Sequence, residues 1–166
     1  MDYCYVEFVP KDTESLYRTI ELFGMVKAAK EANEAVNEKP LVDYLSDVER
    51  AYFWNPSPEE SKEWHDQWFS TPLEIRHSRK MLTPQWHLES MLDAFWNGDY
   101  DLVAIQEENG KHYLTFYPYG YPYGGTGCMV AFLECFGHRI VGIDDGTGYD
   151  KYVPQAEFWK PKKKQG

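Results

Sequence analysis

The spacing of the apolar residues changes at Gly98, and this change constrains the fold more than any other feature of the chain. Before Gly98, residues 88–96 carry apolar side chains at i, i+3, i+4, i+7 and i+8, which predicts an amphipathic helix that the glycine ends. After it, the apolar run at 102–105 predicts a short strand, and Asn109-Gly110 predicts a two-residue type I′ turn. A return strand then covers residues 112–117. A helix followed directly by a hairpin indicates a fold with both helical and sheet layers.

Two further strands complete the expected sheet. Residues 2–9 alternate between apolar and polar side chains, which predicts a half-buried strand. Residues 139–143 predict a last strand, which follows a helix at 128–136 and leads into a glycine-rich turn at 144–148. The sequence therefore predicts an α+β fold with a small, mainly antiparallel sheet. The N-terminal strand, the hairpin and the C-terminal strand form this sheet, which packs against several helices.

The region between the first strand and Gly98 predicts helices. Asp12 or Thr13 can cap a helix that Gly24 ends, and a second, partly exposed helical piece follows as far as residue 36. Residues 41–52 predict another helix. Three more helix starts share a Ser/Thr-Pro pair, at residues 57, 71 and 83, and the first two also carry the glutamate of a capping box.

One domain is expected over residues 1–154, followed by a loosely ordered, lysine-rich tail at 155–166. The apolar fraction of 43% is enough for a sizeable core. The side chains expected to be buried lie on the predicted helices and strands of the second half: Leu88, Met91, Leu92, Phe95, Leu114, Phe116, Val130, Leu133 and Val141.

Charge and cysteine usage exclude several classes of function. The formal net charge of −10 repels phosphate backbones, so the sequence predicts no nucleic-acid binding. Such a charge would attract a basic partner, or it serves solubility alone. No apolar stretch approaches the length of a membrane span, and the N-terminus lacks a secretory signal. The three cysteines do not form a disulfide framework, so we expect a reduced, cytoplasmic setting and no contact with membranes.

Cys128 is the first candidate site residue. It opens a predicted helix directly after Gly124-Gly125, where the helix amides can stabilise a thiolate. Together with His138 and Asp144 it could form a Cys–His–Asp relay, which resembles papain-like cysteine peptidases, whose nucleophile also opens a helix. The resemblance departs from that pattern because a helix separates Cys128 from His138 by roughly 14 Å; His112 is a freer partner. The alternative is that Cys128 is a small core residue.

The second candidate is a loop in which tyrosine alternates with proline or glycine. Tyrosine gives a large contact area at a low cost in conformational entropy, and proline stiffens the loop. The loop is interpreted either as a binding surface or as a compact loop packed on its own rings. Its candidate binding residues are Tyr117, Tyr119, Tyr121, Tyr123, Gly124 and Gly125.

The remaining motifs predict no metal site and no cofactor. The histidines at 65, 77 and 87 lack the i, i+4 spacing or the His–Glu spacing of a metal site on a helix. Residues 144–148 lack the ligand pattern of an EF-hand, and the glycines at 124–127 match neither a Walker loop nor a dinucleotide fingerprint.

The sequence favours a protein-binding module that is not an enzyme. In size, acidity and aromatic content the chain is similar to inhibitor and immunity-type proteins of bacteria, which implies another protein, basic in character, as its partner. The alternative is a hydrolase or transferase that uses Cys128 as a nucleophile. A reactive thiol would be alkylated rapidly near neutral pH, whereas a core thiol would resist until the protein unfolds.

Overall fold

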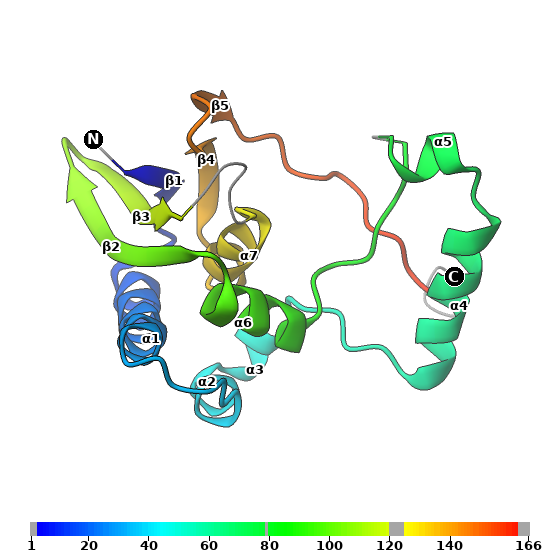
Figure 1. Cartoon of the computed structure of the whole chain (residues 1–166), viewed down its shortest axis with the longest axis horizontal. Coiled ribbons are helices and arrows are strands. Elements are labelled where there is room, and N and C mark those ends of the chain that lie inside the picture. Colours follow the sequence, from blue (N-terminus) through cyan, green and yellow to red (C-terminus); the bar gives the residue numbers. More distant parts are fainter. Residues whose placement is uncertain (1–2, 79, 120–124, 163–166) are drawn as a thin grey trace.

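The computed structural model describes residues 3–78, 80–119 and 125–162, and within them the fold is α+β, as the sequence predicts (Figure 1). An antiparallel sheet packs against helices. Across this sheet the strands follow the order β2 (Tyr100–Glu108), β3 (Lys111–Pro118), β1 (Cys4–Val9), β4 (Arg139–Asp144) and β5 (Tyr149–Lys151). The helices are α1 (Thr13–Glu31), α2 (Lys39–Tyr44), α3 (Asp47–Arg50), α4 (Pro58–Ser70), α5 (Leu73–Arg76), α6 (Leu88–Asn97) and α7 (Gly127–Cys135).

The N-terminal strand β1 lies at the centre of the sheet. Val6 is opposite Leu114 of β3 and Ile143 of β4, so the first strand joins the hairpin to the C-terminal strand. The hairpin turn has the predicted geometry, because Asn109 and Gly110 have φ values of 53° and 79°. Both values are positive, as a type I′ turn requires, and the prediction for the turn is confirmed. The short edge strand β5 was not predicted.

Helices α1, α6 and α7 pack on one face of the sheet and enclose the core (Figure 1). Eight of the nine predicted core residues are buried, and Val141 is only half-buried. The cause is a β-bulge: Glu7 is opposite Gly142 and Phe8 is opposite Ile140, so Val141 has no partner on β1. Ile140 takes the core position instead and is 7% exposed.

Several predicted helix boundaries were wrong. Helix α1 continues through Gly24 to Glu31, because Gly24 lies on the exposed face while its neighbour Phe23 is buried. The single helix expected at 41–52 is divided into α2 and α3 by Ser46, which caps α3 in a capping box. The Thr71 hydroxyl does not cap α5; it donates to the carbonyl of Gln67 at 2.6 Å. No helix begins at Thr83, and α6 starts only at residue 88.

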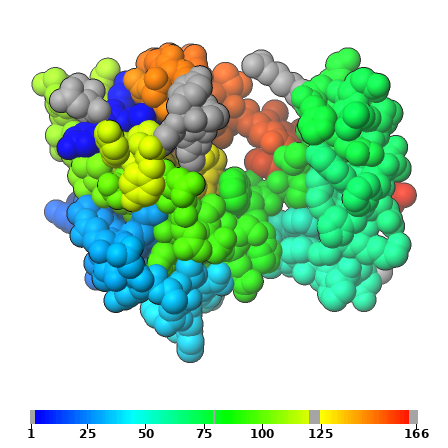
Figure 2. All heavy atoms as spheres, in the orientation of Figure 1, coloured from blue at the N-terminus to red at the C-terminus, as the bar shows by residue number. Residues whose placement is uncertain are grey.

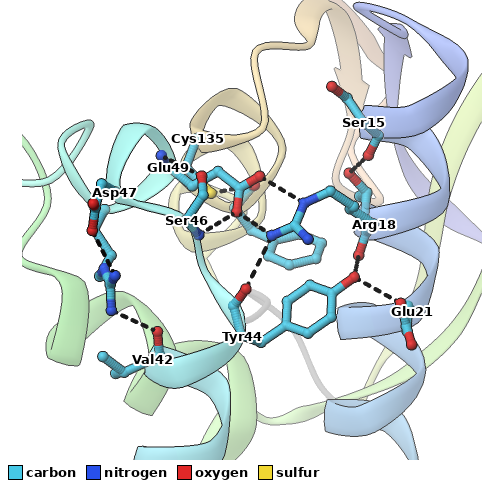
Figure 3. A network of polar contacts seen from close by, with 12 residues as sticks. Ser15, Arg18, Glu21, Val42, Tyr44, Ser46, Asp47, Glu49 and Cys135 are labelled. Atoms are coloured by element: carbon cyan, nitrogen blue, oxygen red, sulfur yellow. Dashed lines mark hydrogen bonds and ion pairs between the residues drawn. The ribbon is translucent and has the colours of Figure 1, made fainter.

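An ion pair fixes α2 and α3 to α1 (Figure 3). Arg18 donates from Nε to Glu49 Oε2 at 2.9 Å and from Nη2 to Glu49 Oε1 at 2.6 Å. Arg18 Nη2 also donates to the carbonyl of Tyr44, and the hydroxyl of Tyr44 donates to the carbonyl of Arg18. Glu49 further accepts the backbone N–H of Ser46, so the same carboxylate caps α3 and pairs with α1.

Helices α4 and α5 stand to one side of the sheet and its helices (Figures 1 and 2). We call residues 54–86 together with 153–162 the tryptophan arm. Its centre is a ring cluster in which the Trp159 ring centroid lies 5.1 Å from that of Trp64 and 5.9 Å from that of Trp54. The tail is described as far as residue 162, where the backbone N–H of Lys162 donates to Glu63 of α4. No helix in the described residues is long and apolar enough to cross a membrane.

Candidate functional site

The face of the sheet opposite α1 and α7 carries aromatic and acidic side chains. Successive residues of a strand point to opposite faces, so the residues that alternate with the buried Val6, Phe8, Leu114 and Phe116 point away from the core. Among the described residues no helix contacts this face. We call it the outer face, and its strand residues include four tyrosines, four carboxylates and three cations: Tyr5, Glu7, Asp101, Glu108, Lys111, Tyr113, Tyr117, Arg139, Asp144, Tyr149 and Lys151.

The tyrosines of the outer face contact one another across the strands. The ring of Tyr5 lies edge-on to the ring of Tyr113, with 5.0 Å between the centroids, and 6.4 Å from the ring of Tyr149. The ring of Tyr149 lies directly over Gly142, where a Cβ would be 2.2 Å from the Tyr149 hydroxyl oxygen. Glycine at position 142 therefore lets the ring lie against β4, and the rings form a continuous surface over β3, β1, β4 and β5.

Carboxylates surround these rings. Asp144 is opposite Tyr5 and Tyr149, and Glu7 is opposite Tyr113. Burial raises the pKa of the Tyr5 phenol, and the nearby carboxylate of Asp144 raises it further. The raised pKa keeps the Tyr5 phenol protonated, so its hydroxyl remains a hydrogen-bond donor.

A shallow depression of about 360 Å³ opens at one end of the outer face. Two carboxylates, two tyrosines and a single cation line it, together with the turn residue Asn109. These lining residues are Tyr5, Glu108, Asn109, Lys111, Tyr113 and Asp144. The depression therefore has a net negative charge beside aromatic rings, which suits a cationic group with an apolar stem.

The tyrosine loop is only partly within the described residues. Tyr117 and Tyr119 are 53% and 61% exposed, so both rings have free area for contacts. The Tyr119 hydroxyl donates to the carboxylate of Asp101 on β2, and this hydrogen bond raises the pKa of the phenol. Gly125 supplies its carbonyl oxygen to the Cys128 thiol. Tyr121, Tyr123 and Gly124 lie outside the described residues.

Cys128 lies in the core at the start of α7. It is 3% exposed, and its sulfur contacts the Tyr100 hydroxyl and the Gly125 carbonyl, each at 3.4 Å. Burial raises the pKa of the thiol, which is the opposite of what a nucleophilic cysteine needs. The first turn of α7 therefore holds a neutral thiol, as the core interpretation of Cys128 expects.

The structure does not bring Cys128, His138 and Asp144 together. His138 lies beyond the far end of α7, where Nδ1 accepts the backbone N–H of Lys11 at 3.0 Å and Nε2 is 2.7 Å from the Thr19 hydroxyl. Burial lowers the pKa of His138 to about 4, so the ring is neutral and structural. Asp144 lies on the outer face and accepts the N–H of Gly146. His112 contacts Phe8 and Glu107, so it is also not a partner of the thiol.

Sequence reasoning missed most residues of the outer face. Tyr113 and Tyr149 were not candidates, and Asp144 was assigned to a catalytic relay. The signal was present, because the alternation of residues 2–9 and 112–117 that predicted the core face also places every intervening side chain on the opposite face. What the sequence lacked was the strand order, which brings the tyrosines of β1, β3 and β5 to one face.

No group of three or more His, Cys, Asp or Glu side chains with metal-binding geometry is found in the described part of the chain. The chain matches no protein-family model, and comparisons with curated proteins and with solved structures found no match either.

Proposed function

We propose that this protein is a non-catalytic module that binds another, basic protein through the outer face of its sheet. The observation that carries the proposal is the composition of this open face. Four tyrosines and four carboxylates lie together with three cations on the sheet, and no helix in the described residues covers them. A solvated sheet face without a binding role needs only polar side chains.

The shape of the outer face favours a protein over a small molecule as the partner. Its depression is shallow, whereas sites for small ligands enclose most of the ligand surface. Tyrosine is among the residues that dominate the free energy of protein interfaces, because its ring gives apolar contact and its hydroxyl donates a hydrogen bond. Tyr117 and Tyr119 extend the same surface at the end of β3, so the tyrosine loop and the outer face would act together.

The charge of the outer face favours lysine and arginine side chains on the partner. Glu7, Glu108 and Asp144 provide carboxylates beside ring faces that attract cations. The net charge of −10 would also accelerate the encounter with a basic protein. An inhibitor or immunity-type role in the cytoplasm is consistent with this chemistry, and the three free thiols suit a reducing compartment.

Site-specific photo-crosslinking in the native host tests the proposal. A benzophenone side chain would replace Tyr117 or Tyr149 on the outer face, and Tyr17 on the opposite, helical side would be the matched control. Tyr17 is 66% exposed, so it is as accessible as either test position. We expect one basic protein to be crosslinked from positions 117 and 149 and not from position 17.

The charge of the face is then tested in the same assay. The double variant Glu7→Gln/Asp144→Asn removes two charges and keeps the shapes and the acceptor for the Gly146 N–H. Crosslinking should fall strongly while the melting temperature stays close to that of the parent. Equal crosslinking from all three positions, an acidic partner, or full crosslinking by the neutral variant would each show that the outer face is not the binding surface.

A further inference from the structure

A second, deeper cavity lies on the helical side of the molecule, away from the outer face. It has a volume of about 220 Å³ and is enclosed by α7, by the segment 83–86 and by the tail residues 152–158. One side of α7 forms its floor with residues at i, i+3, i+4 and i+7, from Gly127 to Glu134. Gln155 joins two of the walls, because its side chain donates to the carbonyl of Thr83 at 3.3 Å.

The polar end of the cavity is the carboxylate of Glu134. Its Oε1 accepts the hydroxyls of Tyr52 and Tyr152 at 3.3 and 3.4 Å, which are long hydrogen bonds. No lysine, arginine or histidine in the described residues forms an ion pair with Glu134. A half-buried carboxylate without a cation is costly in its charged form, so a cation placed beside Glu134 would stabilise that form.

The walls beside Glu134 are aromatic. Trp86 and Phe158 line the cavity together with Tyr52 and Tyr152. The Trp86 ring packs against Gly127, where a Cβ would lie 3.2 Å from the ring, so the indole lies close to the floor of the cavity. Aromatic faces around one carboxylate form the arrangement that recognises an ammonium group, because the ring faces are negative and the carboxylate supplies the counter-charge.

We propose that this cavity binds the ammonium group of a small alkylamine or of a lysine side chain, with Glu134 as the counter-ion and the aromatic rings as the walls. The alkyl stem would lie against Val130, Ala131 and Ile143, which form the apolar part of the lining. This site does not depend on the proposed function, because none of its lining residues belongs to the outer face.

The protonation of the cavity supports this assignment. Burial raises the pKa of Glu134 by more than the hydrogen bonds from Tyr52 and Tyr152 lower it, so the charged form is only partly compensated. Burial also raises the pKa of Tyr152, to about 12, so its hydroxyl remains a donor to the carboxylate. A bound ammonium ion would lower the pKa of Glu134 by direct attraction. Binding should therefore strengthen as the pH rises through the pKa of Glu134 in the free protein.

The test is an NMR titration of the full chain, followed through the indole N–H signals. The probe is butylammonium chloride, and 1-butanol, which has the same number of heavy atoms and no charge, is its control. Glu134→Gln removes the charge and keeps the shape, while Glu89→Gln on the exposed side of α6 is the matched control variant. We expect Glu134→Gln to weaken butylammonium binding by roughly tenfold or more, since charge-assisted contacts are stronger than neutral ones. Glu89→Gln should leave it unchanged.

A second variant covers the case in which Glu134→Gln does not fold. Tyr152→Phe removes one hydroxyl that competes for the carboxylate, so butylammonium binding should be kept or strengthened. Loss of binding in Tyr152→Phe, equal affinity for 1-butanol, or unchanged binding by folded Glu134→Gln would each overturn the proposal, as would the absence of any binding. A lysine whose backbone amino and carboxyl groups are both blocked distinguishes a lysine side chain from a free alkylamine as the ligand. If this probe binds, the cavity is assigned to a protein side chain; if it does not bind while butylammonium does, the cavity is assigned to a free amine.

Discussion

The ion pair between Arg18 and Glu49 allows a quantitative prediction about stability. The Glu49 side chain is 12% exposed and that of Arg18 is 30% exposed, so the carboxylate depends on its partners for compensation (Figure 3). Arg18→Met removes both side-chain donors and leaves only the N–H of Ser46. Breaking a buried pair costs up to about 5 kcal/mol, and because Arg18 retains contact with solvent we expect a loss of about 2–3 kcal/mol.

The assay is urea denaturation at pH 7, repeated at lower pH. The pKa of Glu49 is depressed in the folded protein, where its hydrogen bonds with Arg18 and with the backbone of Ser46 outweigh the effect of burial. A depressed pKa contributes stability above the unfolded pKa, and this contribution is lost as the pH falls through the folded pKa. The difference between the parent and Arg18→Met should therefore be largest at neutral pH and should shrink in acid.

The control is the exposed pair Lys39–Asp43, whose side chains are 82% and 60% exposed. Solvent screens such pairs, so Lys39→Met should cause no measurable loss of stability. The double variant Arg18→Met/Glu49→Leu should lose less than the sum of the two single variants, because it leaves no unpaired charge. The reasoning is refuted if Arg18→Met costs no more than Lys39→Met, or if its cost stays constant down to strongly acidic pH.

Four further predictions follow from the packing and protonation of the described residues. Leu92 is 1% exposed, so Leu92→Ala should cost about 2–5 kcal/mol in urea denaturation, and a loss below about 1 kcal/mol would mean that α6 is loosely packed. The buried Cys128 thiol should react with iodoacetamide only on unfolding. Rapid labelling of the native protein would instead indicate that the thiol is a nucleophile. The pKa of His138 is lowered from 6.5 to about 4, so stability should decrease as the pH falls through this window, where the unfolded chain binds the proton and the native ring does not. The same series with His138→Leu should lack that decrease. Gly142→Ala should displace the half-exposed Tyr149 ring and weaken partner binding while changing the free energy of unfolding by less than about 1 kcal/mol. A larger loss of stability would mean that the packing of this ring stabilises the fold.

The sequence predicted the elements whose signals are local. The stripe of α6 and the Asn109-Gly110 turn each depend on neighbouring residues alone, and both were predicted correctly. The errors arose where tertiary contacts outweigh local preference. Burial of Phe23 and Val26 carries α1 through Gly24, whose cost of about 1 kcal/mol is small beside the burial of two apolar side chains.

For the candidate sites too, the sequence predicted what depends on neighbouring residues and not what depends on tertiary packing. The position of Cys128 at the start of a helix was correct, but its depth and its distance from His138 depend on packing that no local pattern contains. The outer face needed the strand order, and the Glu134 cavity needed segments far apart in the sequence: residue 52, residues 83–86, α7 and residues 152–158. The tyrosine loop was a candidate because its pattern is contiguous, while the tyrosines of the outer face are dispersed over three strands.

The carboxylates of the outer face would also disfavour a dimer formed by two copies of this face. An open sheet face rich in tyrosine is apolar enough to attract a second copy of the same face. In such a pair the carboxylates of Glu7, Glu108 and Asp144 would face the same carboxylates of the other copy across a desolvated interface. Juxtaposed like charges destabilise an interface by several kcal/mol, which is on the order of the stabilisation that the tyrosine contacts could provide. With the basic partner that we propose, the same carboxylates would instead attract, so one set of carboxylates would both disfavour self-association and select that partner.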